Sequence, residues 1–143
     1  MKTSRDPRHL RRRATVRQLF SLSFTDQGEW HESEIAPKIW EKKGELDEYI
    51  RKVAVKWPPE RLNKLDLAIL RLAIFELLYD RAEPVKVIID EAVEISKEFG
   101  SKSSASFVNG VLGKIVKEQN LMPSEEAGEE AGENNLETQA SEG

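Results

Sequence analysis

Residues 63–82 read NKLDLAILRLAIFELLYDRA, and on a helical wheel their apolar side chains leave almost no polar face. A helix that is apolar on nearly all sides is typically surrounded by its neighbours rather than lying on a surface. Asp66, Arg71 and Glu76 interrupt the stretch, which is too short to span a bilayer, since a span needs about 20 predominantly apolar residues. Asn63 is suited to cap the helix. The stretch therefore predicts the central helix of an all-α domain.

Helical periodicity recurs on both sides of this stretch, and no segment alternates as a strand would. Pro58-Pro59 ends one amphipathic pattern, whose Trp57 we interpret as a core anchor together with Trp40. Gly100 is expected just after the end of a further amphipathic helix, and Ser103 or Ser104 is expected to cap the start of the last helix. We expect about six helices, over residues 8–24, a short segment ending at 43, then 45–57, 63–82, 85–99 and 105–119.

The chain lacks the usual parts of an enzyme site. It has no cysteine, which excludes disulfides and thiolate metal sites, and only two histidines, His9 and His31, in different segments. There is no Gly-rich phosphate loop, no Ser/His/Asp set and no HExxH motif. We expect neither enzymatic activity nor a cofactor or metal. Without an apolar signal segment or transmembrane run, the chain is expected to be cytoplasmic.

Charge is distributed unevenly along the chain. From Pro123 onward there are seven Glu and no Lys or Arg, which leaves 22 basic against 19 acidic side chains in the rest. The first 17 residues carry seven basic side chains against Asp6 alone. Such a basic front suggests a polyanionic partner, although a solubilising terminus would have the same composition. Arginines in a first helical turn oppose the helix dipole, which favours a functional reason for them.

Acidic side chains also occur on the predicted helix 85–99. Asp90, Glu91, Glu94 and Glu98 are expected on its outer face with Lys97. Paired carboxylates can perform acid–base chemistry when they are buried. With no nucleophile nearby in the sequence, we interpret this face as an ordinary solvated surface.

Three segments follow from these patterns. Residues 1–7 are expected to be a disordered basic N-terminus, and residues 8–120 a helical domain with a polyanionic partner, which the resemblance given below implies to be RNA. Residues 121–143 are expected to be a disordered acidic tail, because the run EEAGEEAGE lacks the apolar content to fold.

Residues 65–116 resemble the C-terminal half of the bacterial NusB family of transcription antitermination factors. Three blocks carry the resemblance: LDLAILRLAIFELL, EPVKVIIDEAVEISKEFG and FVNGVLGKI. The basic RRRATVRQLF is similar to the family's Arg-rich opening, so the resemblance extends over roughly residues 8–118. It implies an all-α fold of two small helical subdomains. The stretch before Pro58 is some twenty residues shorter than usual, which implies a shortened N-terminal subdomain.

The resemblance also implies a function. Family members bind the single-stranded boxA element of nascent ribosomal RNA together with the ribosomal protein NusE, and help RNA polymerase to resist termination; they need no cofactor. Carried over to this sequence, NusE contacts fall on Phe20 and Asp66, although Phe20 could equally be core and Asp66 a helix-cap acid. Phe107 has the same core alternative. RNA contacts would fall on Arg8, Arg11, Arg12, Arg13, Ser103, Ser106 and Phe107.

Two other functions remain open. A NusB-like domain also occurs in ribosomal RNA cytosine methyltransferases, but this chain has no room for a methyl-donor site. Alternatively the chain is a protein-interaction module, or a homodimer that covers its basic surface, with no antitermination role.

Overall fold

The computed structural model describes residues 6–25 and 32–121, and within them the chain is all-helical. The expected all-α class is confirmed. Trp30, His31 and the acidic tail lie outside the described residues, as do residues 1–5. The described elements are α1 (Pro7–Leu22), α2 (Ala36–Glu41), α3 (Lys43–Val53), a 3-10 turn η1 (Pro59–Arg61), α4 (Lys64–Leu78), α5 (Val85–Phe99) and α6 (Lys102–Glu118).

The apolar stretch forms α4, and α4 packs against each of the other five α-helices described. Its side chains are buried almost continuously from Asp66 to Phe75. The side chain of Asn63 accepts a hydrogen bond of 2.8 Å from the backbone N–H of Asp66, so Asn63 is the predicted N-cap. The helix ends at Leu78 rather than Ala82, since residues 79–82 are exposed and Pro84 disfavours helical geometry just before it.

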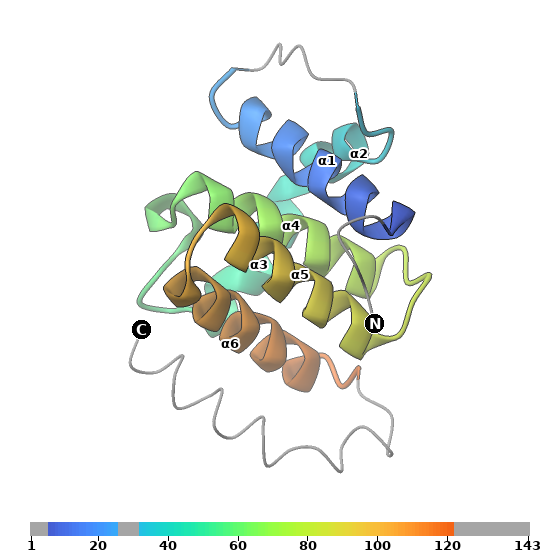
Figure 1. Ribbon diagram of the computed structural model, residues 1–143. Helices are drawn as coiled ribbons and strands as arrows, with labels where there is room; N and C mark the ends of the chain where they lie inside the picture. The colour runs from blue at the N-terminus through green and yellow to red at the C-terminus, as the bar shows by residue number, and fades with distance from the viewer. Residues whose placement is uncertain (1–5, 26–31, 122–143) are drawn as a thin grey trace.

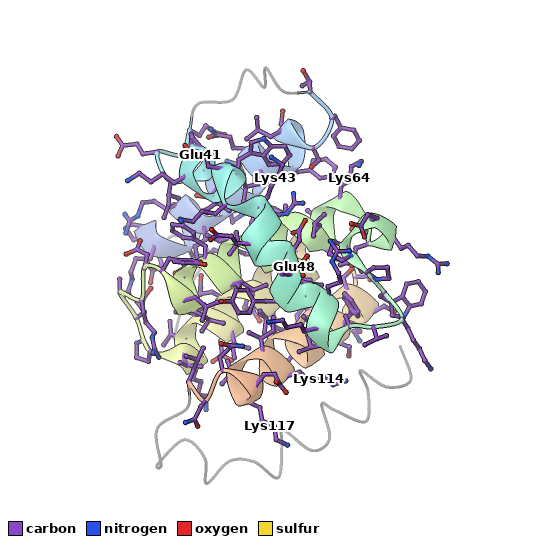
Figure 2. The ribbon with its side chains drawn as sticks, turned by 180° about the vertical axis from the view of Figure 1, so that it is seen from behind. Glu41, Lys43, Glu48, Lys64, Lys114 and Lys117 are labelled. Carbon is purple, nitrogen blue, oxygen red and sulfur yellow. The ribbon has the colours of Figure 1, made fainter. Side chains whose placement is uncertain are left out.

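Figure 1 shows the arrangement around this helix, with α1 crossing above α4 and α5 beside α6 on the near side. Seen from behind, α3 runs across the molecule with Glu48 on its outer side (Figure 2). One core joins all six helices, because its buried side chains come from Val16 and Leu19 in α1 through to Val116 in α6. Between α1 and η1 the structure describes two helices, α2 of six residues and α3 of eleven.

The boundaries predicted around α3 are wrong in two places. Gly44 does not separate two helices but lies in the first turn of α3, where no other atom would crowd a side chain. The helix ends at Val53 rather than Trp57, because a residue that precedes proline is restricted to extended geometry. Trp57 is consequently 38% exposed and is not a core anchor. Trp40 does pack against the core, as predicted.

The predicted starts of α1 and α6 are also corrected. Asp6 caps α1, accepting a hydrogen bond of 2.9 Å from the backbone N–H of Arg8, and Pro7 is its first residue. Asp6 and Pro7 are therefore ordered, in contrast to the predicted disordered segment 1–7. The N-cap of α6 is Ser101 rather than Ser103 or Ser104, with its hydroxyl 3.1 Å from the backbone nitrogen of Ser104.

Candidate nucleic-acid interface

Arg12 of α1 lies inside the protein rather than on the basic front. Its guanidinium reaches Glu76 of α4 at 2.8 and 2.6 Å, and Glu83 in the α4–α5 loop at 2.6 Å. A third carboxylate, Glu91 of α5, lies 3.6 Å away. Burial lowers the pKa of Arg12, but the bonds to Glu76 and Glu83 outweigh this and raise it overall. The predicted role of Arg12 in binding RNA is therefore replaced by that of an internal ion-pair centre.

The remaining arginines of α1 are more accessible, and three of them have carboxylate neighbours. Arg8 lies 3.0 Å from Glu83, and Arg17 lies 3.2 Å from Glu32. Arg13 is 3.7 Å from Glu98, and its guanidinium lies 5.2 Å from the centre of the Phe99 ring. An anionic ligand would have to compete with these carboxylates, which lowers the net positive field of α1.

Arg11 is exposed, and among residues 6–25 and 32–121 it makes no ion pair. It borders a groove of about 630 Å³ between α1, the segment before α2 and the C-terminal end of α4. Arg8 and Arg12 line the same groove, together with Glu32, Glu34, Glu76, Asp80 and Glu83. The groove thus combines exposed guanidinium groups with a carboxylate rim.

The start of α6 forms the second part of the predicted surface. Ser103 and Ser106 are exposed, whereas Phe107 is partly buried against the core. Arg13 connects this part with α1, because Phe99 beneath its guanidinium is the last residue of α5, two positions before the α6 cap Ser101. The structure therefore brings Arg13 and the α6 start together, while Arg12 faces inward.

Gly100 makes the tight connection between α5 and α6 possible. A Cβ atom there would lie 3.0 Å from the carbonyl oxygen of Ser96 and 3.1 Å from the hydroxyl oxygen of Ser104. The φ angle of Gly100 is −120°, so close approach of the two helices, rather than a left-handed backbone, favours glycine.

The two residues predicted to face NusE have different environments. Phe20 is exposed at the C-terminal end of α1, edge-on to Phe24 at a ring distance of 5.0 Å. Lys64, at the start of α4, places its ammonium 5.6 Å from the Phe24 ring. Asp66 is only 7% exposed, and burial raises the pKa of its carboxyl although the Ser104 hydroxyl opposes this. This buried position, in the first turn of α4, favours the interpretation of Asp66 as a helix-cap acid over that of a NusE contact.

A buried cluster that the sequence did not predict joins α1 to α5. His9 lies between Glu91 and Glu98, with Nδ1 2.8 Å from Glu91 Oε1 and Nε2 2.6 Å from Glu98 Oε1. Glu91 is therefore buried, and its assignment to a solvated face was wrong. The seven-residue spacing of the two glutamates, two helical turns, was the available signal that they share one face.

Metal-binding clusters and membrane-spanning helices are both absent from the part of the chain that the structure describes. No group of three or more His, Cys, Asp or Glu side chains there is arranged to hold a metal ion. None of its helices has the length and apolarity needed to cross a membrane.

The fold and surface together define an all-helical domain with an arginine-bearing first helix docked on a C-terminal helical core. The NusB family model matches residues 26–117. Because that match covers more than half of the sequence, the chain belongs to the NusB family. The predicted family assignment is confirmed.

Individual relatives agree with this assignment. The transcription antitermination protein NusB of Herpetosiphon aurantiacus is 44% identical over 96 residues, which cover 65% of this chain and 66% of that protein. The protein of the same name from Dehalococcoides mccartyi strain CBDB1 is 54% identical over 72 residues, half of each chain. The alignments thus span about half to two thirds of these curated relatives. The solved structure of T. maritima NusB superimposes with a TM-score of 0.68 at 34% identity, covering 87% of this chain and 97% of that one.

Proposed function

We propose that this protein is a bacterial, cytoplasmic transcription antitermination factor without enzymatic activity or a cofactor. In this role it binds boxA-type single-stranded RNA of nascent ribosomal RNA together with NusE, within the complex that keeps RNA polymerase elongating. Membership of the NusB family supports the proposal, as do relatives that bear the name transcription antitermination protein. The structural observation that carries it is the exposed Arg11 beside the groove, on a helix fixed by the buried Arg12.

The RNA side of the proposal uses α1 and the start of α6. Arg8 and Arg11 would contact phosphates, and Arg13, whose guanidinium lies 5.2 Å from the centre of the Phe99 ring, would offer a planar cation to a base. Ser103 and Ser106 supply exposed hydroxyl groups at the α6 start, and Phe107 an aromatic edge. Stacking of a base on such a side chain contributes ~1–3 kcal/mol. Arg12 acts indirectly in this scheme by fixing α1.

The NusE side of the proposal uses the exposed rings at the far end of α1. Phe20 and Phe24 form an aromatic pair beside the cationic Lys64, and Phe24 is 64% exposed. Aromatic residues are enriched in protein interfaces relative to the rest of the surface. Asp66 is omitted from this contact surface because its side chain is buried in the free protein.

Fluorescence anisotropy with a labelled boxA-like oligonucleotide and a scrambled one, with and without NusE, tests this function. Tighter binding of the boxA-like RNA, strengthened by NusE, is expected. Arg11→Ala should weaken binding. Lys114→Ala is the matched control and should leave binding unchanged, because Lys114 lies on α6, far from α1 (Figure 2). Equal affinity for both RNAs in the presence of NusE would contradict the proposal.

A protein-interaction role without antitermination is the second candidate. The carboxylates that pair with Arg8, Arg13 and Arg17 favour it, since they reduce the charge available for RNA. Size-exclusion chromatography with light scattering distinguishes the two. A stable dimer that RNA does not dissociate would support this second role.

A further inference from the structure

His9 holds two carboxylates at once, deep between α1 and α5. The side chain is 5% exposed, and each ring nitrogen is within hydrogen-bonding distance of a different glutamate, at 2.8 Å for Glu91 and 2.6 Å for Glu98. The glutamates lie on one face of α5, so the imidazole joins the two helices at two points.

Hydrogen-bond chemistry restricts the protonation state of this cluster. A neutral imidazole carries one N–H and therefore donates only once, whereas an ionised carboxylate only accepts. The second ring nitrogen would then face a carboxylate oxygen lone pair to lone pair. Only the imidazolium donates to both glutamates without moving a proton onto one of them.

The arginines near the cluster oppose a further positive charge, but the carboxylates around them are more numerous, four against the three guanidinium groups of Arg8, Arg12 and Arg13, so the net charge favours the imidazolium. On α1, Arg12 lies 3.6 Å from Glu91 and Arg13 lies 3.7 Å from Glu98. Arg12 is also bound by Glu76 of α4 and Glu83 of the α4–α5 loop, so its charge is shared among three carboxylates. Burial lowers the pKa of His9, but its hydrogen bonds to Glu91 and Glu98 outweigh the burial and raise it overall.

We propose that His9, as an imidazolium bonded to Glu91 and Glu98, is a positioning residue that fixes α1 on α5 and so presents Arg8 and Arg11 to RNA. This inference rests on the proposed function. His9 itself is buried and does not touch the ligand. Its action is transmitted by the helix, because Arg8 and Arg11 lie one and two positions away on α1.

The sign of the pH dependence follows from the raised pKa. Stabilisation by His9 is complete below the pKa of an unfolded histidine, about 6.5, and is lost as the pH rises through the higher value of the folded state. The arginines remain charged throughout this range. RNA affinity should therefore fall as the pH rises above about 6.5 and through the raised pKa of His9, rather than through the groups that contact phosphate.

The test compares wild type, His9→Gln and His9→Arg by RNA anisotropy at pH 6.5 and 8.5. At pH 6.5, His9→Gln should bind about fivefold more weakly than wild type, within the range of coupling between sites. At pH 8.5 the two should converge, and His9→Arg, with its permanent charge, should show the smallest change with pH. Identical affinity of His9→Gln and wild type at both pH values would overturn the inference.

A measurement without RNA keeps the two proposals distinguishable. In a His31→Gln background, ¹⁵N NMR should show both nitrogens of His9 protonated at pH 6.5 and a pKa above that of a free histidine. A singly protonated His9 at that pH would overturn the inference even if RNA binds. If the NMR result is as expected but wild type binds no boxA-like RNA at pH 6.5, the proposed function fails, and the role of His9 in RNA binding fails with it.

Discussion

Arg71, in the middle of α4, forms a two-point ion pair with Asp47 of α3. Its Nε lies 2.9 Å from Oδ1 and its Nη2 lies 2.8 Å from Oδ2, while the guanidinium lies 5.4 Å from the centre of the Trp40 ring. The arginine that interrupts the apolar stretch is thus paired inside the protein. It connects the central helix to α2 and α3.

Asp47→Ala should therefore destabilise the fold strongly. The substitution leaves the buried guanidinium of Arg71 without its carboxylate, a change that costs about 3–5 kcal/mol in buried pairs. Urea unfolding followed by circular dichroism measures the loss. Glu48→Ala is the matched control, since Glu48 pairs with the exposed Arg51 on the outer side of α3 (Figure 2) and should cost under about 1 kcal/mol. Equal losses for the two variants would contradict the assignment.

Arg11→Ala and Arg12→Ala should separate binding from stability. Arg12→Ala leaves the part-buried Glu76 without its ion pair and removes one of the two cations beside each of Glu83 and Glu91, so it should lower the free energy of unfolding by about 3–5 kcal/mol. Arg11→Ala should change stability by less than ~0.5 kcal/mol, as a surface substitution. It should instead reduce the salt dependence of RNA binding by about one unit of slope per lost phosphate contact. An unchanged slope with unchanged affinity would mean that Arg11 does not contact RNA.

Ile74→Ala should cost roughly 2–5 kcal/mol, because its side chain is fully buried within the central helix and its loss leaves a cavity. Thermal or urea unfolding checks this value. Val55→Ala offers a control of similar chemistry at an exposed position and should be nearly neutral. A loss below about 1 kcal/mol for Ile74→Ala would contradict the central position of α4.

Asp66→Asn should stabilise the free protein at neutral pH. Burial raises the pKa of this carboxyl in the folded state, so the ionised form is disfavoured there and stability falls as the pH rises through the folded value. The amide escapes that penalty, and the cap bond to the backbone N–H of residue 66 is kept. The melting temperature of the variant should exceed that of wild type at pH 7, and the difference should shrink below about pH 4. A lower melting temperature at pH 7 would show that the ionised form is favoured.

The architecture was predictable because it depends on local patterns. The apolar periodicity of residues 63–82 identified the central helix, and Asn63 fixed its start, since a cap acts within one turn. The helix boundaries were predicted wrongly where a nearby residue such as proline ends a helix although the apolar periodicity continues. Trp57 continues the apolar stripe of α3, yet Pro58 after it ends the helix earlier.

The candidate site was only partly predictable. Periodicity showed that α1 is basic, but the partners of its arginines lie far along the sequence, 64 residues from Arg12 to Glu76 and 89 from His9 to Glu98. A pattern on one helix does not say which helix faces it. Arg12 was therefore assigned to the surface, and Glu91 to solvent, although the two face one another.

The ion pairs of α1 also impose an order of events during synthesis. α1 leaves the ribosome before its partners in α4 and α5: Glu76 follows Arg12 by 64 residues, and Glu91 follows His9 by 82, roughly 4–16 s at bacterial and eukaryotic rates of translation. Until residue 76 has been made, the arginines of the nascent helix have none of the α4 and α5 carboxylates to pair with. Proteolysis of ribosome-bound chains arrested before and after residue 98 should show α1 becoming protected only in the longer chain. α1 is thus synthesised before its carboxylate partners, and its packing is completed only after they have been made.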